Sequence, residues 1–121
     1  MRVTLELPHP PSVNVYYRRS GHHIHISEQG RKFKLNVSEI IATHHPIKFN
    51  MLRLKVHIDY YPPTKRKTDI DNRIKAVLDS LTDAGLWLDD EQVDELSIKR
   101  MPVYKGGKIV VTVESIEPND E

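Results

Sequence analysis

Four side chains in the second half of the chain have the types and spacing to bind a metal ion and act on a phosphodiester. Asp69 and Asp71 stand two residues apart, Lys75 follows Asp71 by four residues, and Asp90 belongs to an acidic turn. Mg²⁺ and Mn²⁺ prefer carboxylate oxygens, and phosphodiester hydrolysis needs charge neutralisation and a hydroxide made from water. The three aspartates are therefore candidate metal ligands, and Lys75 is a candidate cation for the same phosphate or water.

Each of these residues also has an ordinary structural interpretation. Aspartates stabilise helix N-termini by capping and through the helix dipole, so Asp69 and Asp71 could simply begin a helix. Lys75 could form an exposed ion pair with Asp71 or Asp79, and Asp90 could belong to a solvated turn. By spacing alone, helix capping is the better interpretation of the two neighbouring aspartates.

The segments around the aspartates predict how they are positioned. Helical spacing of apolar residues predicts a helix over about residues 71–83, with Gly85 where a C-terminal glycine belongs. These apolar residues are Ile74, Val77, Leu78 and Leu81. If Asp71 is the N-cap, Asp69 lies just outside in extended chain, Ile70 points inward, and both carboxylates can face one cation. The apolar run 86–88 is expected to anchor the following acidic turn near this helix.

Alternation of apolar and polar residues predicts the strands. They are expected at residues 3–7, 51–60, 96–98 and 109–113. Residues 104–107 include two glycines, so a turn there is expected to join the last two strands as a terminal hairpin.

The remaining segments complete the predicted fold. A hairpin is expected within residues 14–26, and a helix is expected between Ser27 and Pro46. This helix has an apolar stripe, for which we expect a place in the core, with a dimer seam as the alternative: Phe33, Val37, Ile40 and Ile41. The prediction is an α+β fold, a mixed β-sheet with two helices packed on it, as a single domain over residues 1–121. Residues 117–121 have nothing to bury and are expected to fray.

Composition limits the class of protein. The 121 residues include no cysteine, which excludes disulfides and thiolate zinc sites. No run of about 18 apolar residues is present and the start lacks a signal-peptide pattern, so we expect no membrane partner and a cytoplasmic location.

The charge is distributed unevenly along the chain. Residues 1–68 hold 12 Lys and Arg against 4 Asp and Glu, or +8, and residues 69–121 hold 6 against 13, or −7, which together give the net +1. The two halves could simply pack against each other, but basic residues beside the aspartates also suit DNA phosphates. The candidate DNA-binding residues are Lys65, Arg66, Lys67, Asn72, Arg73, Arg18 and Arg19.

The stretch from residue 65 to 93 resembles the signature of the RusA-type Holliday junction resolvases, the crossover junction endodeoxyribonucleases of bacteria and their prophages. Its motif here is Asp69-x-Asp71-Asn72-x-x-Lys75, then Asp79, then Gly85-x-Trp87-Leu88-Asp89-Asp90. Residues 10–17 and 99–107 are also similar to the family, so the resemblance covers nearly the whole chain. Thr68 departs from the basic run expected before the first aspartate.

The resemblance implies a specific activity. Members are expected to be homodimeric, Mg²⁺-dependent endonucleases, with Mn²⁺ as a possible substitute, that nick four-way DNA junctions symmetrically in recombination and repair and leave 5′-phosphate ends. It assigns metal binding to Asp69, Asp71 and Asp90, and catalysis to these aspartates with Lys75. Asp89 is a weaker candidate. A bacterial or prophage-encoded cytoplasmic protein is implied.

Other interpretations remain open at this point. The chain could be a DNA-structure-binding module whose aspartates only cap a helix, or a phosphodiesterase that acts on flaps or RNA. His22-His23-x-His25 resembles a metal clip, but a hairpin offers few further ligands. Tyr16 and Tyr17 are expected to pair within strands rather than to stack on bases at a junction centre.

Overall fold

A four-stranded mixed sheet forms the framework of the computed structural model, which describes residues 1–117. Its strands are β1 (Arg2–Pro8), β6 (Lys108–Ser115), β4 (Leu54–Tyr61) and β5 (Val93–Arg100), in the order β1-β6-β4-β5. β6 is antiparallel to both β1 and β4, whereas β4 and β5 are parallel. The predicted α+β class with a mixed sheet is confirmed.

The predicted terminal hairpin is wrong. Both of its strands exist, but β4 lies between β5 and β6. Every second side chain is buried along β4 and along β6 as far as Val113, whereas Leu96 of β5 stays 43% exposed. The two most apolar strands therefore occupy the centre, and β5, which carries Asp94, Glu95, Lys99 and Arg100, suits an edge. Gly106 and Gly107 allow the chain to turn but do not decide which strand it joins.

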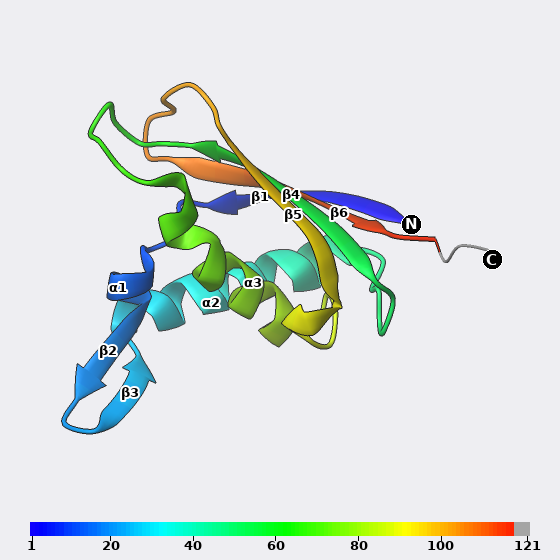
Figure 1. The fold of residues 1–121 in the computed structure, drawn as a ribbon, viewed down its shortest axis with the longest axis horizontal. Helices are drawn as coiled ribbons and strands as arrows, with labels where there is room; N and C mark the ends of the chain where they lie inside the picture. The colour runs from blue at the N-terminus through cyan, green and yellow to red at the C-terminus, as the bar shows by residue number, and fades with distance from the viewer. Residues whose placement is uncertain (118–121) are drawn as a thin grey trace.

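Two long helices cover one face of the sheet (Figure 1). α2 (Glu28–His44) begins at Ser27, whose hydroxyl accepts the Gly30 N–H at 3.0 Å, and ends at His45 in the left-handed conformation. α3 (Ile74–Asp83) follows a short 3₁₀ helix, η1 (Ile70–Arg73), so the helix predicted over 71–83 begins with a tighter turn. The predicted apolar stripe of α2 lies in the core, with Phe33, Val37 and Ile41 buried and Ile40 packed against them. Among the described residues no helix is long and apolar enough to cross a membrane.

A small hairpin projects beyond the sheet and helices (Figure 1). It consists of β2 (Tyr17–Ser20) and β3 (His23–Ile26), so the hairpin predicted within 14–26 is shorter, and a four-residue helix, α1 (Val13–Tyr16), precedes it. Tyr16 is fully buried in α1 rather than paired in a strand. Of the predicted frayed residues 117–121, all but Glu117 lie outside the described residues.

Glycine is needed where the hairpin meets α2. A Cβ atom on Gly30 would lie 2.7 Å from Cγ2 of Ile26 and 2.8 Å from the carbonyl oxygen of Tyr16. The same carbonyl accepts the Ser27 N–H at 2.8 Å. The missing side chain thus lets the hairpin base pack directly on the helix.

Candidate active site

The turn at η1 carries the first two candidate aspartates. Asp69 is extended, with φ −82° and ψ 136°, and Asp71 belongs to the first turn of η1. Neither makes a side-chain capping bond, and no hydrogen bond within residues 1–117 involves either carboxylate. Ile70 between them packs against the core, as predicted. The structure therefore gives no support to helix capping as the function of these two exposed carboxylates.

Lys75 lies on the exposed face of α3, one turn before Asp79. Its Nζ is 3.4 Å from Oδ1 of Asp79 and 5.9 Å from the ring centroid of Tyr17. The lysine side chain is 59% exposed and that of Asp79 is 23% exposed. The ion-pair alternative for Lys75 is thus present in the structure, with Asp79 as its partner, and the ammonium remains open to a ligand.

Asp79 also accepts a hydrogen bond from the Tyr17 hydroxyl through its other oxygen. Burial of the hydroxyl raises the pKa of Tyr17 well above its usual range, and the neighbouring Asp79 raises it further. One carboxylate therefore joins the base of the hairpin to the candidate catalytic lysine.

The acidic turn after α3 is fixed by buried residues. Trp87 is fully buried, and its indole Nε1 donates to the Thr82 hydroxyl at 2.5 Å and to Oδ1 of Asp90 at 3.3 Å. The Thr82 hydroxyl in turn donates to Asp90. This confirms that the apolar run around Trp87 anchors the turn near α3, at the C-terminal part of that helix.

Asp89 and Gln92 shape the same turn. Asp89 accepts the Glu91 N–H at 2.9 Å, and the buried Gln92 side chain accepts the N–H groups of Leu88 and Asp89. The Gln92 amide also donates to the carbonyl oxygens of Asn50 and Leu52. Asp89 thus caps the short 3₁₀ helix η2 (Asp90–Gln92). Its carboxylate is already used in this capping bond, which agrees with its place as a weaker candidate for metal binding.

The three aspartates predicted to share a metal ion are not gathered in one chain. Asp69 and Asp71 belong to the turn before α3, whereas Asp90 contacts Thr82 near the end of that helix. Within residues 1–117 no group of three or more histidines, aspartates or glutamates could hold a metal ion. The carboxylate chemistry suits Mg²⁺, but only Asp69 and Asp71 belong to the same turn.

Sequence reasoning gave too little weight to three residues of this site. Asp79 was placed in the family motif and considered as an ion-pair partner of Lys75, but no contact with the hairpin was expected for it, and no function was expected for Thr82. Tyr17 was expected to pair within a strand, and it does, opposite Ile26. The hydrogen bond from its hydroxyl to Asp79 spans 62 positions of sequence, so no local sequence pattern could predict it.

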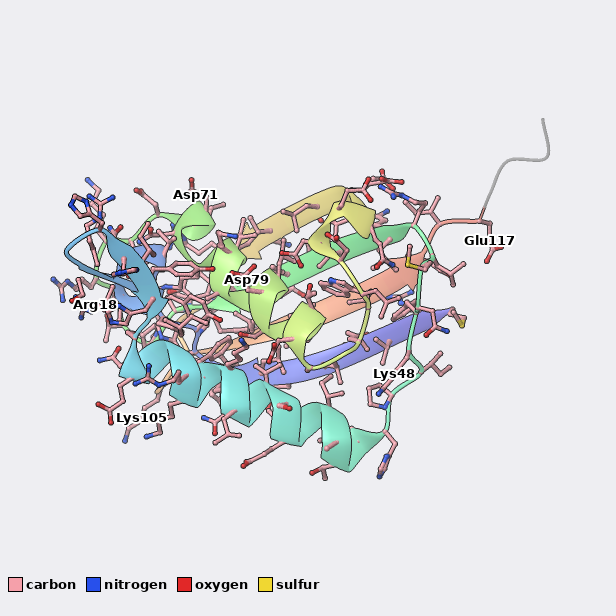
Figure 2. All side chains as sticks on the ribbon, turned by 90° about the horizontal axis from the view of Figure 1, so that it is seen from below. Arg18, Lys48, Asp71, Asp79, Lys105 and Glu117 are labelled. Carbon is pink, nitrogen blue, oxygen red and sulfur yellow. The ribbon has the colours of Figure 1, made fainter. Side chains whose placement is uncertain are left out.

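Basic residues flank the η1 turn on two sides. The exposed Lys65, Arg66 and Lys67 belong to the loop after β4, and Arg66 and Lys67 line a surface hollow together with Asn72. The exposed Arg18 and Arg19 belong to the hairpin. In Figure 2, Arg18, Asp71 and Lys105 lie toward one end of the molecule, whereas Lys48 and Glu117 lie toward the other.

Arg73 has structural partners. Its Nε donates to the Tyr60 hydroxyl at 3.1 Å, and its Nη1 donates to the carbonyl oxygen of Pro10 at 2.9 Å. His9 completes the group, because its Nε2 is 3.0 Å from the same hydroxyl. Arg73 can only donate, so the Tyr60 proton is left for His9 Nε2, which must then be unprotonated. Arg73 therefore ties the η1 turn to β4 and the Pro10 segment.

We expect the His9 imidazole to stay neutral well below neutral pH. Burial, with a smaller contribution from the Arg73 charge, lowers the pKa of His9 from its ordinary value of 6.5 to about 4. The unfolded chain then binds a proton that the folded chain does not, so stability from this group is lost as pH falls from 6.5 towards 4. NMR titration of the His9 ring should give a midpoint near 4, and His9→Gln should reduce the loss of unfolding free energy between pH 7 and pH 4.5. A midpoint near 6.5 would contradict this arrangement.

Comparison with known proteins identifies the family. The family model described as Endodeoxyribonuclease RusA matches residues 8–114. The chain is 40% identical over 110 residues to a crossover junction endodeoxyribonuclease RusA of Shigella sonnei, and 39% identical over 110 residues to one of Escherichia coli K12, covering 91% of this chain and 92% of each relative. It is 41% identical over 115 residues to the enzyme of that name from Enterobacteria phage 82, covering 90% of this chain and 91% of the relative. The resemblance seen in the sequence is confirmed, and the chain belongs to the RusA endodeoxyribonuclease family.

Proposed function

We propose that this chain is a Mg²⁺-dependent endonuclease that resolves four-way DNA junctions by paired symmetric nicks, in the cytoplasm of a bacterium or in prophage-directed recombination and repair. The observation that carries the proposal is the η1 turn, where two carboxylates without hydrogen-bond partners among the described residues lie one helical turn before an exposed lysine. Basic residues flank this turn on two sides, in a chain of the RusA family.

Asp69 and Asp71 would hold the metal ion, because hard divalent cations prefer carboxylate oxygens and both side chains are exposed. When bound there, Mg²⁺, or Mn²⁺ in its place, supplies Lewis-acid activation of the phosphate and a hydroxide from water. Asp90 is proposed as the third ligand, although one chain holds it near the far end of α3.

Lys75 has the charge and exposure to stabilise negative charge on the reacting phosphate. Its ammonium is held beside Asp79, so less conformational freedom is lost when DNA binds. Hydrolysis joins the water oxygen to phosphorus and breaks the bond to the 3′ oxygen, which leaves as a hydroxyl. The products are a 5′-phosphate and a 3′-hydroxyl. Lys65, Arg66, Lys67, Asn72, Arg18 and Arg19 are proposed to contact neighbouring DNA phosphates, with Arg73 fixing the turn from behind.

A homodimer accounts for paired nicks. A two-fold interface places two equivalent sites on opposing strands of a nearly symmetric junction. It is also the simplest arrangement that would bring an Asp90 carboxylate to Asp69 and Asp71, which one chain does not group. The rival interpretation, a binding module whose aspartates cap a helix, loses its main support because neither carboxylate makes the capping bond.

Asp69→Asn and Asp71→Asn should each lower cleavage of a four-way junction by roughly 1,000-fold or more, since each removes a proposed metal ligand. Junction binding, measured by gel shift without Mg²⁺, should be retained. Asp94→Asn is the matched control, because this exposed carboxylate pairs with Arg53 at the edge of the sheet, away from η1. Full activity of both η1 variants would show that these aspartates do not bind the catalytic metal.

Mixed dimers of Asp71→Asn and Asp90→Asn chains test the shared ligand set. If each site takes Asp90 from the partner, the mixed dimer contains one intact site and should nick one strand of the junction, whereas each variant alone is inactive. If each site lies within one chain, both sites of the mixed dimer are damaged. Continued inactivity of the mixture, with dimer exchange verified by differently tagged chains, would contradict the shared site.

A further inference from the structure

A surface hollow lies between the β2–β3 hairpin and the start of α3. Tyr17, Arg18, Arg19, Ile24 and Lys75 line it, together with the beginning of α1. In the antiparallel hairpin Arg19 pairs directly with Ile24, so these two side chains lie on the same face, as does Tyr17 two residues before Arg19. Lys75 lines the same space, and its Nζ is 5.9 Å from the ring centroid of Tyr17, so this face looks towards Lys75. We call the space the hairpin hollow.

The hairpin hollow combines exposed apolar surface with positive charge. Ile24 is 64% exposed on a two-stranded hairpin that projects from the body, so its side chain contributes little to the core (Figure 1). The charged side chains of the hollow are Arg18, Arg19 and Lys75, and no aspartate or glutamate of the described chain lines it. The cationic side chains alone could bind a free phosphate, which would make no use of the apolar surface of Ile24. A nucleobase carried on a phosphodiester chain needs both kinds of surface.

The hollow is fixed to the proposed catalytic machinery. The Tyr17 hydroxyl donates to Asp79, and the same carboxylate holds Lys75 at 3.4 Å. The rings of Tyr17 and Tyr16 also pack edge to face, with centroids 4.8 Å apart, and Tyr16 is fully buried. Tyr17 is therefore held by a hydrogen bond and by a buried ring, and a ligand that enters the hollow lies next to Lys75.

We propose that the hairpin hollow binds an unpaired nucleobase that flanks the scissile phosphate, with Ile24 and Tyr17 against the base and Arg19 and Arg18 on adjacent phosphates. The inference rests on the proposed function, because it takes Lys75 as the residue beside the reacting phosphate. Bases within a continuous duplex are stacked and paired, whereas those at the centre of a four-way junction can leave the stack at low cost. The hollow thus favours branched over linear DNA at the cleavage point itself.

The test removes the base and the isoleucine separately and together. The scissile phosphate is first located by mapping the nicks that the full chain makes with Mg²⁺, and junction affinity is then measured with Ca²⁺ in place of Mg²⁺. An abasic nucleotide beside that phosphate should weaken binding of the unsubstituted chain by about 5-fold or more. Ile24→Ser should weaken binding of the complete junction by a similar factor, and the abasic change should then have little additional effect.

Ile47→Ser is the matched control, because Ile47 is 55% exposed in the segment after α2 and lies outside the hollow. With this variant the abasic junction should lose as much affinity as with the unsubstituted chain. An equal loss of affinity on the abasic junction for Ile24→Ser and for the unsubstituted chain would overturn the proposal.

A second outcome would also overturn it. If sedimentation gives Ile24→Ser a lower mass than the unsubstituted chain, Ile24 lies in an interface with a second copy of the chain rather than against a base. If the chain nicks no junction, both the proposed function and the proposed base site are rejected. If it nicks the junction but the abasic change and Ile24→Ser weaken binding independently, only the base site is rejected.

Discussion

The requirement that α3 bury one face against the sheet decides where the charged residues of the site lie. Ala76, Val77, Ser80 and Leu81 are buried, so the opposite stripe, with Lys75 and Asp79, must face outward. A 3₁₀ turn at the N-terminal end of the helix carries Asp69 and Asp71 on the surface. Fully buried Trp87 then fixes the chain just after the helix and sets the position of Asp90. The periodicity of α3 and the buried Trp87 ring thus determine where the charged residues of the site lie along this one helix.

Two carboxylates hold this helix to neighbouring segments, one across 62 positions of sequence and one within eight. Asp79 receives the hydroxyl of Tyr17 from the hairpin, and Asp90 receives the hydroxyl of Thr82 and the indole N–H of Trp87. Charge-assisted hydrogen bonds of this kind are stronger than neutral ones and restrict the donors. The exposed Asp69 and Asp71 have no such partners among the described residues. This contrast separates aspartates that hold the site together from aspartates that are open to a ligand.

Local patterns in the sequence predicted the elements well. Strict alternation identified β4, and the apolar spacing and Ser27 identified α2, because both depend on periodicity and capping within a few residues. The extended conformation of Asp69 and the inward Ile70 followed from the same local reasoning. The insertion of β4 between β5 and β6 did not, since the glycine turn at 106–107 is compatible with a hairpin or a crossover. The Tyr17 contact with Asp79 depends on long-range packing, which spacing alone does not encode. The anchoring of the Asp90 turn near α3 was predicted, but its hydrogen bond from Thr82 and its separation from the η1 aspartates were not.

The central claim, metal-dependent junction resolution by the η1 turn and Lys75, is tested most directly by one cleavage map. A synthetic four-way junction, labelled in turn on each of its four strands, would be incubated with the full chain with and without Mg²⁺, beside a linear duplex of the same sequence. We predict paired nicks at symmetric positions on two opposing strands, only with Mg²⁺, with ends that a ligase can seal. Equal cleavage of the linear duplex, or an intact junction in the presence of Mg²⁺ and of Mn²⁺, would contradict it.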